Sequence, residues 1–274
     1  MSTKGSEETC QWQKQGAVHV SREGVVATVS LENTEKLNAL SVWMWIELAR
    51  VVHALSQDLT LRCVVLRGAG QSAFAAGADI AEFASVRQTR EQGMIYHQEY
   101  VSGALKALAQ CPHPVVAMIY GPCVGGGLEL ASQCDLRLAA TSARFGVPIN
   151  RLGFSIALDE LTSVWPIVGE TNLRELLLEG RVWDAAEAFD KGLVCKVVPD
   201  DQLAQVVSDC VRRIVEGAPL VARWHKKMIR RLSSPVKPIG EKDRQASFDY
   251  FDTQDFILGY EAFMKKQKPQ FQGR

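Results

Sequence analysis

Hydrophobic and polar positions in the first 140 residues form short apolar runs that alternate with longer amphipathic stretches. Two β-branched runs are separated by Glu23-Gly24, a dipeptide typical of a hairpin turn. Ser41 has the side chain of a helix N-cap and precedes a stretch with helical spacing. These patterns predict strands at 17–22, 25–31, 62–67, 115–119 and 135–140, and helices at 42–55 and 128–133. The stretch at 80–109 is predicted to be helical with irregular breaks.

After Gly153 the helical pattern dominates. One short apolar run predicts a strand at 194–198, just before Pro199. The rest predicts helices at 157–164, 170–178, 184–191, 201–216, 219–232, 241–252 and 255–266. We therefore expect an α/β protein with β/α units first and a mostly helical part after them.

Composition narrows the class of protein. The 274 residues include 31 Lys plus Arg and 31 Asp plus Glu, so the formal net charge is zero. A nucleic-acid or anionic-membrane partner would need a basic excess, and we expect neither. The seven cysteines include no Cys-x-x-Cys pair, and the five histidines show no metal-ligand spacing. We expect reduced thiols, no metal site, a cytoplasmic location and a loose polar tail at 1–15.

Two stretches carry candidate chemistry, because each leads from a predicted strand through very small residues into a predicted helix. The first reads SAFAAGADI at 72–80, and the second reads YGPCVGGGLE at 120–129. Small residues allow close approach of the main chain, and a helix start presents unpaired N–H groups at the positive end of its dipole. Two such starts on one side of a sheet would direct two donors at one oxygen anion, an arrangement worth about 2.7–4 kcal/mol per donor.

A simpler interpretation of these stretches stays open at this point. Three consecutive glycines also let a helix pack closely on a strand without any ligand. Phosphate- and dinucleotide-binding motifs do not fit, since the chain lacks Gly-x4-Gly-Lys-Ser/Thr and the first stretch lacks Gly-x-Gly-x-x-Gly.

Several segments, taken together, resemble the crotonase, or enoyl-CoA hydratase/isomerase, superfamily. In order along the chain they are KLNALS at 36–41, FAAGADI at 74–80, GPCVGGGLELASQCDLRLAA at 121–140, ARFGVP at 143–148, KGLV at 191–194 and GYEAF at 259–263. The resemblance covers the chain from about residue 15 to the C-terminus. It implies a crotonase-like spiral of ββα units over 16–200, followed by a helical region at 201–274 that mediates trimerisation.

The resemblance also implies a coenzyme A thioester as the ligand, with coenzyme A as part of the substrate and no separate cofactor. By match to the family motifs, Ala78 and Gly126 carry the two N–H donors. The other residues implied to contact coenzyme A are Lys36, Leu37, Ala76, Asp79, Ile80, Ala81, Phe263 and Lys266. The last two resemble contacts that a neighbouring subunit often supplies, in a homotrimer or a dimer of trimers.

Glu129 is the first candidate for proton transfer, three residues after Gly126 in the opening turn of the predicted helix. The resemblance places one of the two hydratase glutamates here, and a positioned carboxylate contributes roughly 10²–10⁴-fold to a rate. The alternative is a glutamate that only stabilises the helix N-terminus, which is worth about 0.3–1 kcal/mol. The resemblance favours catalysis.

The second family glutamate is missing, because Ile149 occupies its position. An isoleucine cannot move a proton, so the two-carboxylate hydratase mechanism and the common isomerase mechanism each lack a group. Asp159 and Glu160 are candidates to replace it, although two ordinary first-turn helix acids are the simpler interpretation. His97 lies in the variable segment that shapes the acyl pocket in the family, and is a candidate for its lining.

The sequence therefore predicts an acyl-CoA enzyme that stabilises a thioester enolate, with an enoyl-CoA hydratase-type lyase as the leading assignment. One alternative is an enoyl-CoA isomerase or an acyl-CoA decarboxylase that uses a single carboxylate. Another, from a different class, is a non-catalytic acyl-CoA-binding or assembly subunit that keeps the donors and lacks the chemistry.

Overall fold

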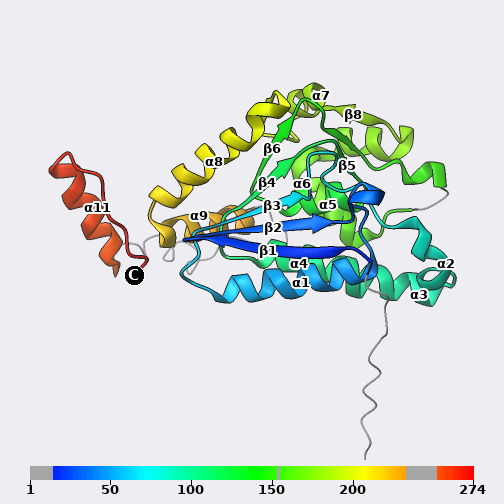
Figure 1. The fold of residues 1–274 in the computed structure, drawn as a ribbon, viewed down its shortest axis with the longest axis horizontal. Coiled ribbons are helices and arrows are strands. Elements are labelled where there is room, and N and C mark those ends of the chain that lie inside the picture. The colour runs from blue at the N-terminus through cyan, green and yellow to red at the C-terminus, as the bar shows by residue number, and fades with distance from the viewer. Residues whose placement is uncertain (1–14, 153–154, 233–251) are drawn as a thin grey trace, which may run out of the picture.

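The computed structural model describes residues 15–152, 155–232 and 252–274. Its framework is a six-stranded sheet in the order β1-β2-β3-β4-β6-β9, which runs through the centre of Figure 1. The strands are β1 Ala17–Glu23, β2 Val26–Glu32, β3 Cys63–Gly68, β4 Val115–Ile119, β6 Leu136–Ala140 and β9 Lys196–Val198. Each corresponds to a strand expected from the sequence, which confirms those expectations apart from shifts at the ends.

Burial explains why the central strands could be predicted from the sequence. β3 and β4 pair in parallel, with Val64 opposite Val115, and nearly all of their residues are buried. A parallel strand covered on both faces consists of an almost continuous apolar run. The carboxyl ends of these two strands reach the same edge of the sheet, where the two small-residue stretches begin.

A second sheet, in the order β5-β7-β8, was not expected from the sequence. Its strands are β5 Pro122–Val124, β7 Arg144–Gly146 and β8 Val182–Asp184. Each has three residues, which is too few to set a period-two pattern. The small sheet matters for the site because β5 lies within the second small-residue stretch.

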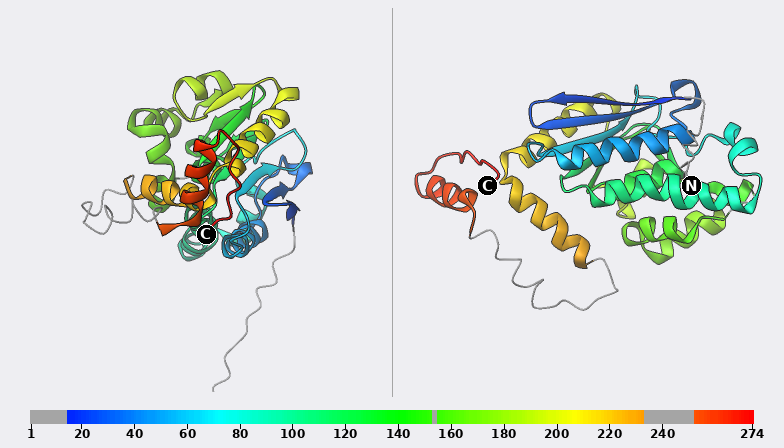
Figure 2. Two further views of the ribbon diagram at one scale, coloured as in Figure 1. Left: turned by 90° about the vertical axis from the view of Figure 1, so that its left-hand side faces the viewer. Right: turned by 90° about the horizontal axis from the view of Figure 1, so that it is seen from below.

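Helices cover both faces of the central sheet (Figure 1, Figure 2). One face is buried by α1 Val42–Gln57, α4 Ser102–Gln110 and α5 Gly126–Gln133, and the other by α8 Asp200–Glu216. Ser41 caps α1 as expected, because its hydroxyl accepts a hydrogen bond from the Met44 N–H at 3.2 Å.

The stretch expected to be one irregular helix at 80–109 is divided into five pieces. They are η2 Ile80–Glu82, α2 Phe83–Val86, α3 Arg90–Ile95, the π-helical η3 Tyr96–Val101, and α4. The expected irregular breaks are confirmed, and one of them falls where Thr89 starts a new helix: its side chain accepts from the Gln92 N–H in a capping box. The interruption brings side chains from 83–97 to the wall of one cavity.

The second half of the described chain is mainly helical, as expected. Its remaining helices are η4 Pro148–Leu152, α6 Leu158–Arg174, η5 Glu175–Glu179, α7 Ala185–Asp190, α9 Pro219–Leu232 and α11 Gln254–Met264, and η1 Thr34–Lys36 lies earlier. Gly169, with φ of 74°, joins the two helices expected at 157–164 and 170–178 across a kink. The expected helix at 241–252 and the expected tail at 1–15 lie almost wholly outside the described residues. Of the helices described, none combines the length and the apolarity that crossing a membrane requires.

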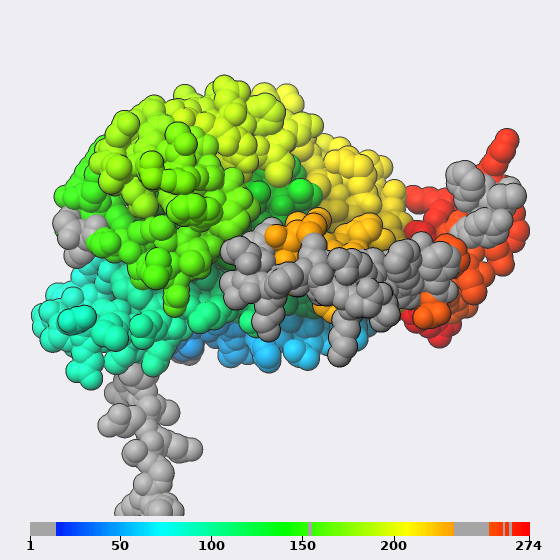
Figure 3. Space-filling model, turned by 180° about the vertical axis from the view of Figure 1, so that it is seen from behind, coloured from blue at the N-terminus to red at the C-terminus, as the bar shows by residue number. Residues whose placement is uncertain are grey.

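The C-terminal helix α11 stands apart from the body of the protein, at the end opposite α2 and α3 (Figure 1, Figure 3). The residues after it return to the body, where Arg62 donates to the Phe271 carbonyl at 2.6 Å. Lys268 forms an ion pair with Glu216 at 2.6 Å. The helix is therefore fastened to the chain mainly through the segment that follows it.

Candidate active site

The first small-residue stretch passes beside the loop that precedes α1. Leu40 donates to the Gly77 carbonyl at 2.7 Å and accepts from the Asp79 N–H at 2.9 Å, which makes a parallel bridge between Leu40 and Ala78. Successive main-chain groups of an extended segment face opposite sides, so the N–H of Ala78 faces away from Leu40. Ala76 and Ala78 both line a cavity at this edge of the sheet.

The second stretch begins α5 so closely against its neighbours that only glycine fits. Gly125 precedes the helix with φ of 52° and ψ of −121°, a conformation that side chains strongly disfavour. A Cβ on Gly127 would lie 2.3 Å from the Ala75 carbonyl oxygen, and one on Gly126 would lie 2.7 Å from the Trp45 ring. Gly126 is the first residue of α5, so its N–H has no partner within the helix.

The two stretches lie side by side. An isolated parallel bridge joins Ala75 to β5. Further along, a Cβ on Gly125 would lie 3.7 Å from the Gly77 Cα, which is ordinary van der Waals contact. Within the main-chain hydrogen bonds of residues 15–152, 155–232 and 252–274, neither Ala78 nor Gly126 donates its N–H. Both of these residues line the same cavity.

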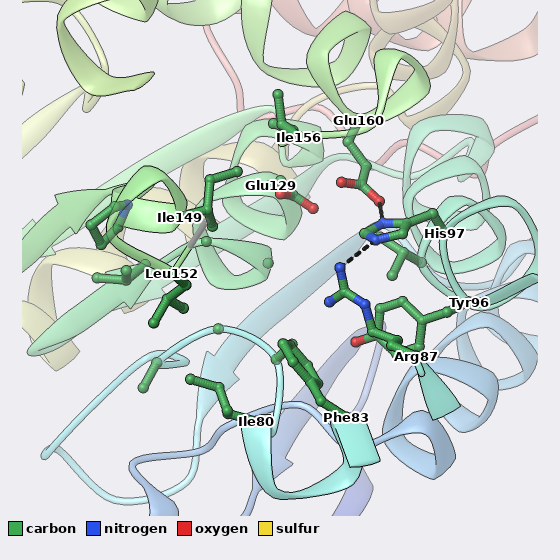
Figure 4. A pocket seen from close by; sticks show the side chains of 18 of the residues that line it. Ile80, Phe83, Arg87, Tyr96, His97, Glu129, Ile149, Leu152, Ile156 and Glu160 are labelled. Atoms are coloured by element: carbon green, nitrogen blue, oxygen red, sulfur yellow. Dashed lines mark hydrogen bonds and ion pairs between the residues drawn. The ribbon is translucent and has the colours of Figure 1, made fainter. Parts of the chain in front are cut away.

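The cavity measures about 210 Å³ and extends between α2, η3, α5 and the start of α6 (Figure 4). Much of its wall is apolar, with side chains that include Phe83, Val101, Pro148, Ile149, Leu152 and Ile156. Its charged or titrating side chains are Arg87, Tyr96, His97, Glu129 and Glu160. In the part of the chain that the structure describes, no group of three or more His, Cys, Asp or Glu residues could hold a metal ion.

Glu129 projects into this cavity from the first turn of α5 (Figure 4). The residue is only 6% exposed. Burial raises the pKa of the Glu129 carboxyl well above its usual value, the charge of Glu160 raises it further, and the Arg87 guanidinium acts in the opposite direction. The site therefore favours the protonated carboxyl, which is the form that donates a proton.

Three side chains from separate elements form a hydrogen-bonded group near Glu129, which we call the Arg87–His97–Glu160 cluster (Figure 4). Arg87 directly follows α2, His97 lies in η3 and Glu160 lies in α6. The Arg87 Nη2 atom lies 2.6 Å from His97 Nε2, and His97 Nδ1 is hydrogen-bonded to Glu160 Oε1. Glu160 is 3% exposed, so the cluster places a nearly buried carboxylate on the cavity wall.

The structure separates the two acids that the sequence offered as replacements for the missing glutamate. Glu160 lines the cavity and contacts His97, whereas Asp159 is exposed to solvent. Neighbouring residues on a helix point about 100° apart, so one can face inward while the other faces outward. Ile149 also lines the cavity, on its apolar side. The geometry favours Glu160 over Asp159 as the second acid.

Residues implied to contact coenzyme A lie together, because Lys36 and Leu37 contact the loop at 76–81, part of which lines the cavity. Lys36 forms an ion pair with the buried Asp79 at 2.6 Å, and Asp79 also accepts from the Ala81 N–H at 3.1 Å. Leu37 and Ile80 are 44% and 56% exposed, which is high for large apolar side chains. The structure thus brings together all of the predicted contacts that come from 36–81.

Phe263 and Lys266 do not join this site within one chain. Lys266 is exposed just after α11, at the end of the molecule away from the cavity (Figure 1). Phe263 lies in α11, outside the residues whose side chains the structure describes.

Sequence reasoning did not single out Arg87, Phe83 or Trp45 as site residues. Trp45 is buried, but it also lines the cavity, and its Nε1–H donates to the Tyr96 hydroxyl at 3.1 Å. The Arg87 guanidinium carbon lies 4.3 Å from the centre of the Phe83 ring. In the sequence, Arg87 is recognisable only as a charged residue two positions before Thr89. Charged residues of this kind are common on solvated surfaces.

Comparisons with known proteins agree with this geometry. The family model described as enoyl-CoA hydratase/isomerase matches residues 21–274. The chain is 30% identical over 254 residues to the short-chain-enoyl-CoA hydratase of Clostridium acetobutylicum, with 92% of this chain and 95% of that protein covered. It is also 30% identical over 255 residues to the crotonyl-CoA hydratase of Syntrophomonas wolfei, with 92% and 96% covered.

Solved structures show the same relationship. An enoyl-CoA hydratase/carnithine racemase from Magnetospirillum magneticum superposes with a TM-score of 0.92 at 43% identity, covering 95% of this chain and 98% of that one. An enoyl-CoA hydratase from Bacillus anthracis gives 0.85 at 29% identity, covering 95% and 100%. The chain therefore belongs to the enoyl-CoA hydratase/isomerase family and has the crotonase fold, which confirms the family and the fold class expected from the sequence.

Proposed function

We propose that this chain is an acyl-CoA lyase of the enoyl-CoA hydratase type, which adds water across the double bond of a 2-enoyl thioester. The observation that carries the proposal is the presence of two N–H groups, at Ala78 and Gly126, in the same cavity as a buried carboxyl at Glu129. The relatives named as hydratases support the same class of reaction.

The Ala78 and Gly126 N–H groups would bind the thioester carbonyl oxygen. Attack at the β-carbon converts the thioester into an enolate, whose oxygen carries the developing negative charge. Two main-chain donors and the positive end of α5 stabilise this charge more than they stabilise the neutral carbonyl, and only such a difference accelerates the reaction. Loss of one donor of this kind costs about 2.7–4 kcal/mol.

Glu160 and Glu129 would divide the two proton transfers. Glu160 is hydrogen-bonded to His97 and accepts a proton from water as the water oxygen bonds to the β-carbon. Glu129 gives its proton to the α-carbon as the enolate collapses. The net reaction adds one water molecule to the double bond. A proton then returns from Glu160 to Glu129 before the next turnover.

The cavity would hold the acyl group while coenzyme A lies outside it. Its volume of about 210 Å³ is below the roughly 300–1,000 Å³ of typical small-molecule sites, as expected for one part of a larger ligand. Lys36, Leu37 and the loop at 79–81 border the entrance and would contact coenzyme A. Since α11 lies away from its own cavity, Phe263 and Lys266 would reach a neighbour's site in a homotrimer or a dimer of trimers.

The test is the absorbance of the conjugated thioester. Purified protein should remove this absorbance from crotonyl-CoA or from a longer 2-enoyl-CoA, while Glu129→Gln should bind the same ester without removing it. If no chain length loses absorbance with the wild-type protein, the hydratase proposal is wrong.

An isomerase or decarboxylase that uses a single carboxylate is the second candidate, favoured by the apolar Ile149 on the cavity wall. Glu129 alone could then carry a proton to or from the α-carbon. Migration of a double bond, or α-deuterium exchange in deuterium oxide without net hydration, would assign this activity. Tight binding of acyl-CoA with neither signal would instead identify a non-catalytic binding subunit.

A further inference from the structure

We infer that Arg87 and His97 are positioning residues, which hold the Glu160 carboxylate in one orientation, facing Glu129 as the second proton-handling group. The hydrogen bonds in this inference are argued from interatomic distances. The expected effect on kcat rests on the proposed function. The inference explains how the chain manages without a carboxylate at Ile149, because a side chain from α6 takes the place of one from η4.

The directions of the two hydrogen bonds follow from the chemistry of Arg87. An arginine side chain has donors only and keeps its proton in proteins, so His97 Nε2, 2.6 Å from Arg87 Nη2, is the acceptor. A neutral imidazole that accepts at Nε2 carries its proton on Nδ1. This N–H donates to Glu160 Oε1, and a charged carboxylate is the stronger acceptor for it. The cluster therefore runs from a cation through a neutral ring to an anion.

Aromatic packing fixes the two donors in place. The Arg87 guanidinium carbon lies 4.3 Å from the centre of the Phe83 ring and 4.8 Å from that of Tyr96. The His97 ring meets Tyr96 edge-on, with ring centres 5.2 Å apart. Contacts of this kind favour one placement of the guanidinium and limit the rotation of the imidazole. The Glu160 carboxylate is thus oriented by groups that are themselves restrained.

The charged and titratable groups around Glu160 come from three elements. Arg87 and His97 face it from 83–97, Tyr96 lies behind them in η3, and Glu129 faces it from α5. Burial raises the pKa of the Tyr96 hydroxyl, which therefore stays neutral. One cation and one anion remain, and the anion at Glu160 opposes a second charge at Glu129. The cluster thereby places the Glu160 carboxylate opposite Glu129, whose carboxyl pKa is raised.

His97 has no ring nitrogen left for the substrate. Arg87 occupies Nε2 and Glu160 occupies Nδ1, so the ring acts through Glu160. Replacement by asparagine keeps a donor close to the position of Nδ1, whereas leucine removes both ring nitrogens at similar size. These two variants therefore separate a positioning donor from a residue that only fills space.

The kinetic experiment compares His97→Leu and His97→Asn with the wild-type protein on an enoyl-CoA that it hydrates. We expect His97→Leu to lower kcat about 10²-fold with little change in KM, because misplacing a catalytic group by about 1 Å costs that much. His97→Asn should recover most of the loss. Arg90→Gln, an exposed change in the same segment, is the matched control and should behave as wild type.

A second measurement needs no turnover. Nitrogen NMR of histidine-labelled wild-type protein should show His97 as a neutral ring with its proton on Nδ1. A proton on Nε2, or on both ring nitrogens at neutral pH, would overturn the inferred arrangement. An unchanged kcat in His97→Leu would overturn the positioning role and leave hydration intact. A wild-type protein that hydrates no enoyl-CoA would overturn the proposed function and the kinetic role together, while NMR still decides the hydrogen-bond arrangement.

Discussion

The two walls of the cavity are built in different ways. The wall at Ala78 and Gly126 is main chain, and it depends on contacts that only very small residues permit. The opposite wall is made of side chains from segments that are distant in the sequence, among them His97 and Glu160, which are 63 positions apart. On the proposed function, a main-chain donor would bind the carbonyl of any acyl-CoA, whereas side chains would decide which proton moves. The comparison then teaches that the first wall would set the class of substrate and the second would set the reaction.

Breaking the main-chain wall should have the largest effect, because it changes both fold and activity. Gly127→Ala would place a Cβ 2.3 Å from the Ala75 carbonyl oxygen, where main chain has to move. We expect the free energy of unfolding to fall by about 3 kcal/mol, and turnover to fall at least about 10²-fold. Thermal unfolding and steady-state kinetics measure the two effects.

Gly103→Ala in α4 is the control for this variant, since nothing lies within 4 Å of the added Cβ. It should stabilise the helix by about 0.5–1 kcal/mol and leave turnover unchanged. If the two alanine variants behaved alike, the close contact at Gly127 would not be what shapes the wall.

The next largest effect should come from Glu129→Gln. The amide keeps the size of the side chain but cannot give up a proton, so kcat should fall roughly 10²–10⁴-fold while affinity for the acyl-CoA is retained. Stopped-flow absorbance and calorimetric titration measure the two quantities. Glu99→Gln, an exposed change in η3, serves as the matched control. Normal turnover by Glu129→Gln would remove this residue from the mechanism.

The neighbouring acids of α6 test the side-chain wall directly. Glu160→Gln should lower kcat about 10²-fold, because the amide cannot accept the proton of water. Asp159→Asn should leave kcat unchanged, since Asp159 is exposed. The same absorbance assay compares the two variants. A larger loss in Asp159→Asn than in Glu160→Gln would reverse their assigned roles.

A smaller effect is expected at Ile149, on the apolar part of the cavity. Ile149→Ala widens the space for the acyl chain. One methylene in a hydrophobic pocket changes the discrimination between two substrates by about 1–3 kcal/mol. The ratio of kcat/KM for a longer chain over a shorter one should therefore rise about 10-fold. Leu178→Ala, at a side chain that is 76% exposed, is the control. An unchanged ratio would place the end of the acyl chain elsewhere.

The smallest expected effect is on stability, and its sign follows from the raised pKa of Glu129. The folded protein holds this proton more tightly than the unfolded chain does, so the stabilising contribution is complete below the unfolded pKa of about 4.3. It is lost as pH rises through the raised folded value. Thermal unfolding should show that Glu129→Gln is more stable than wild type at neutral pH and that the difference shrinks toward pH 4. A difference that grew on acidification would contradict the assigned shift.

Much of the fold could be predicted because its strongest patterns come from burial. The apolar runs of β3 and β4 and the cap at Ser41 each carry a local signal that the structure keeps. The three-residue strands of the second sheet carry no such signal, because they are set by tertiary pairing. Irregular breaks within 80–109 were expected, but their positions, such as the capping box at Thr89, were not assigned from the sequence.

The candidate site, like the fold, has one part that could be predicted from the sequence and one part that could not. The two small-residue stretches could be singled out because close main-chain approach demands tiny residues, and the family resemblance then implied Ala78 and Gly126 as the donors within them. The Arg87–His97–Glu160 cluster could not, because its members meet only after α2, η3 and α6 have packed together. The sequence did offer Glu160, but it could not distinguish it from Asp159.

The central claim is that two distant N–H groups share one carbonyl oxygen, and a crystal structure with an acyl-CoA bound tests it most directly. We expect the nitrogen atoms of Ala78 and Gly126 to lie within about 3.1 Å of the thioester oxygen. An oxygen that contacts only one of them, or nitrogen atoms more than about 6 Å apart, would contradict the claim, since donors so far apart cannot both reach a single atom at that distance.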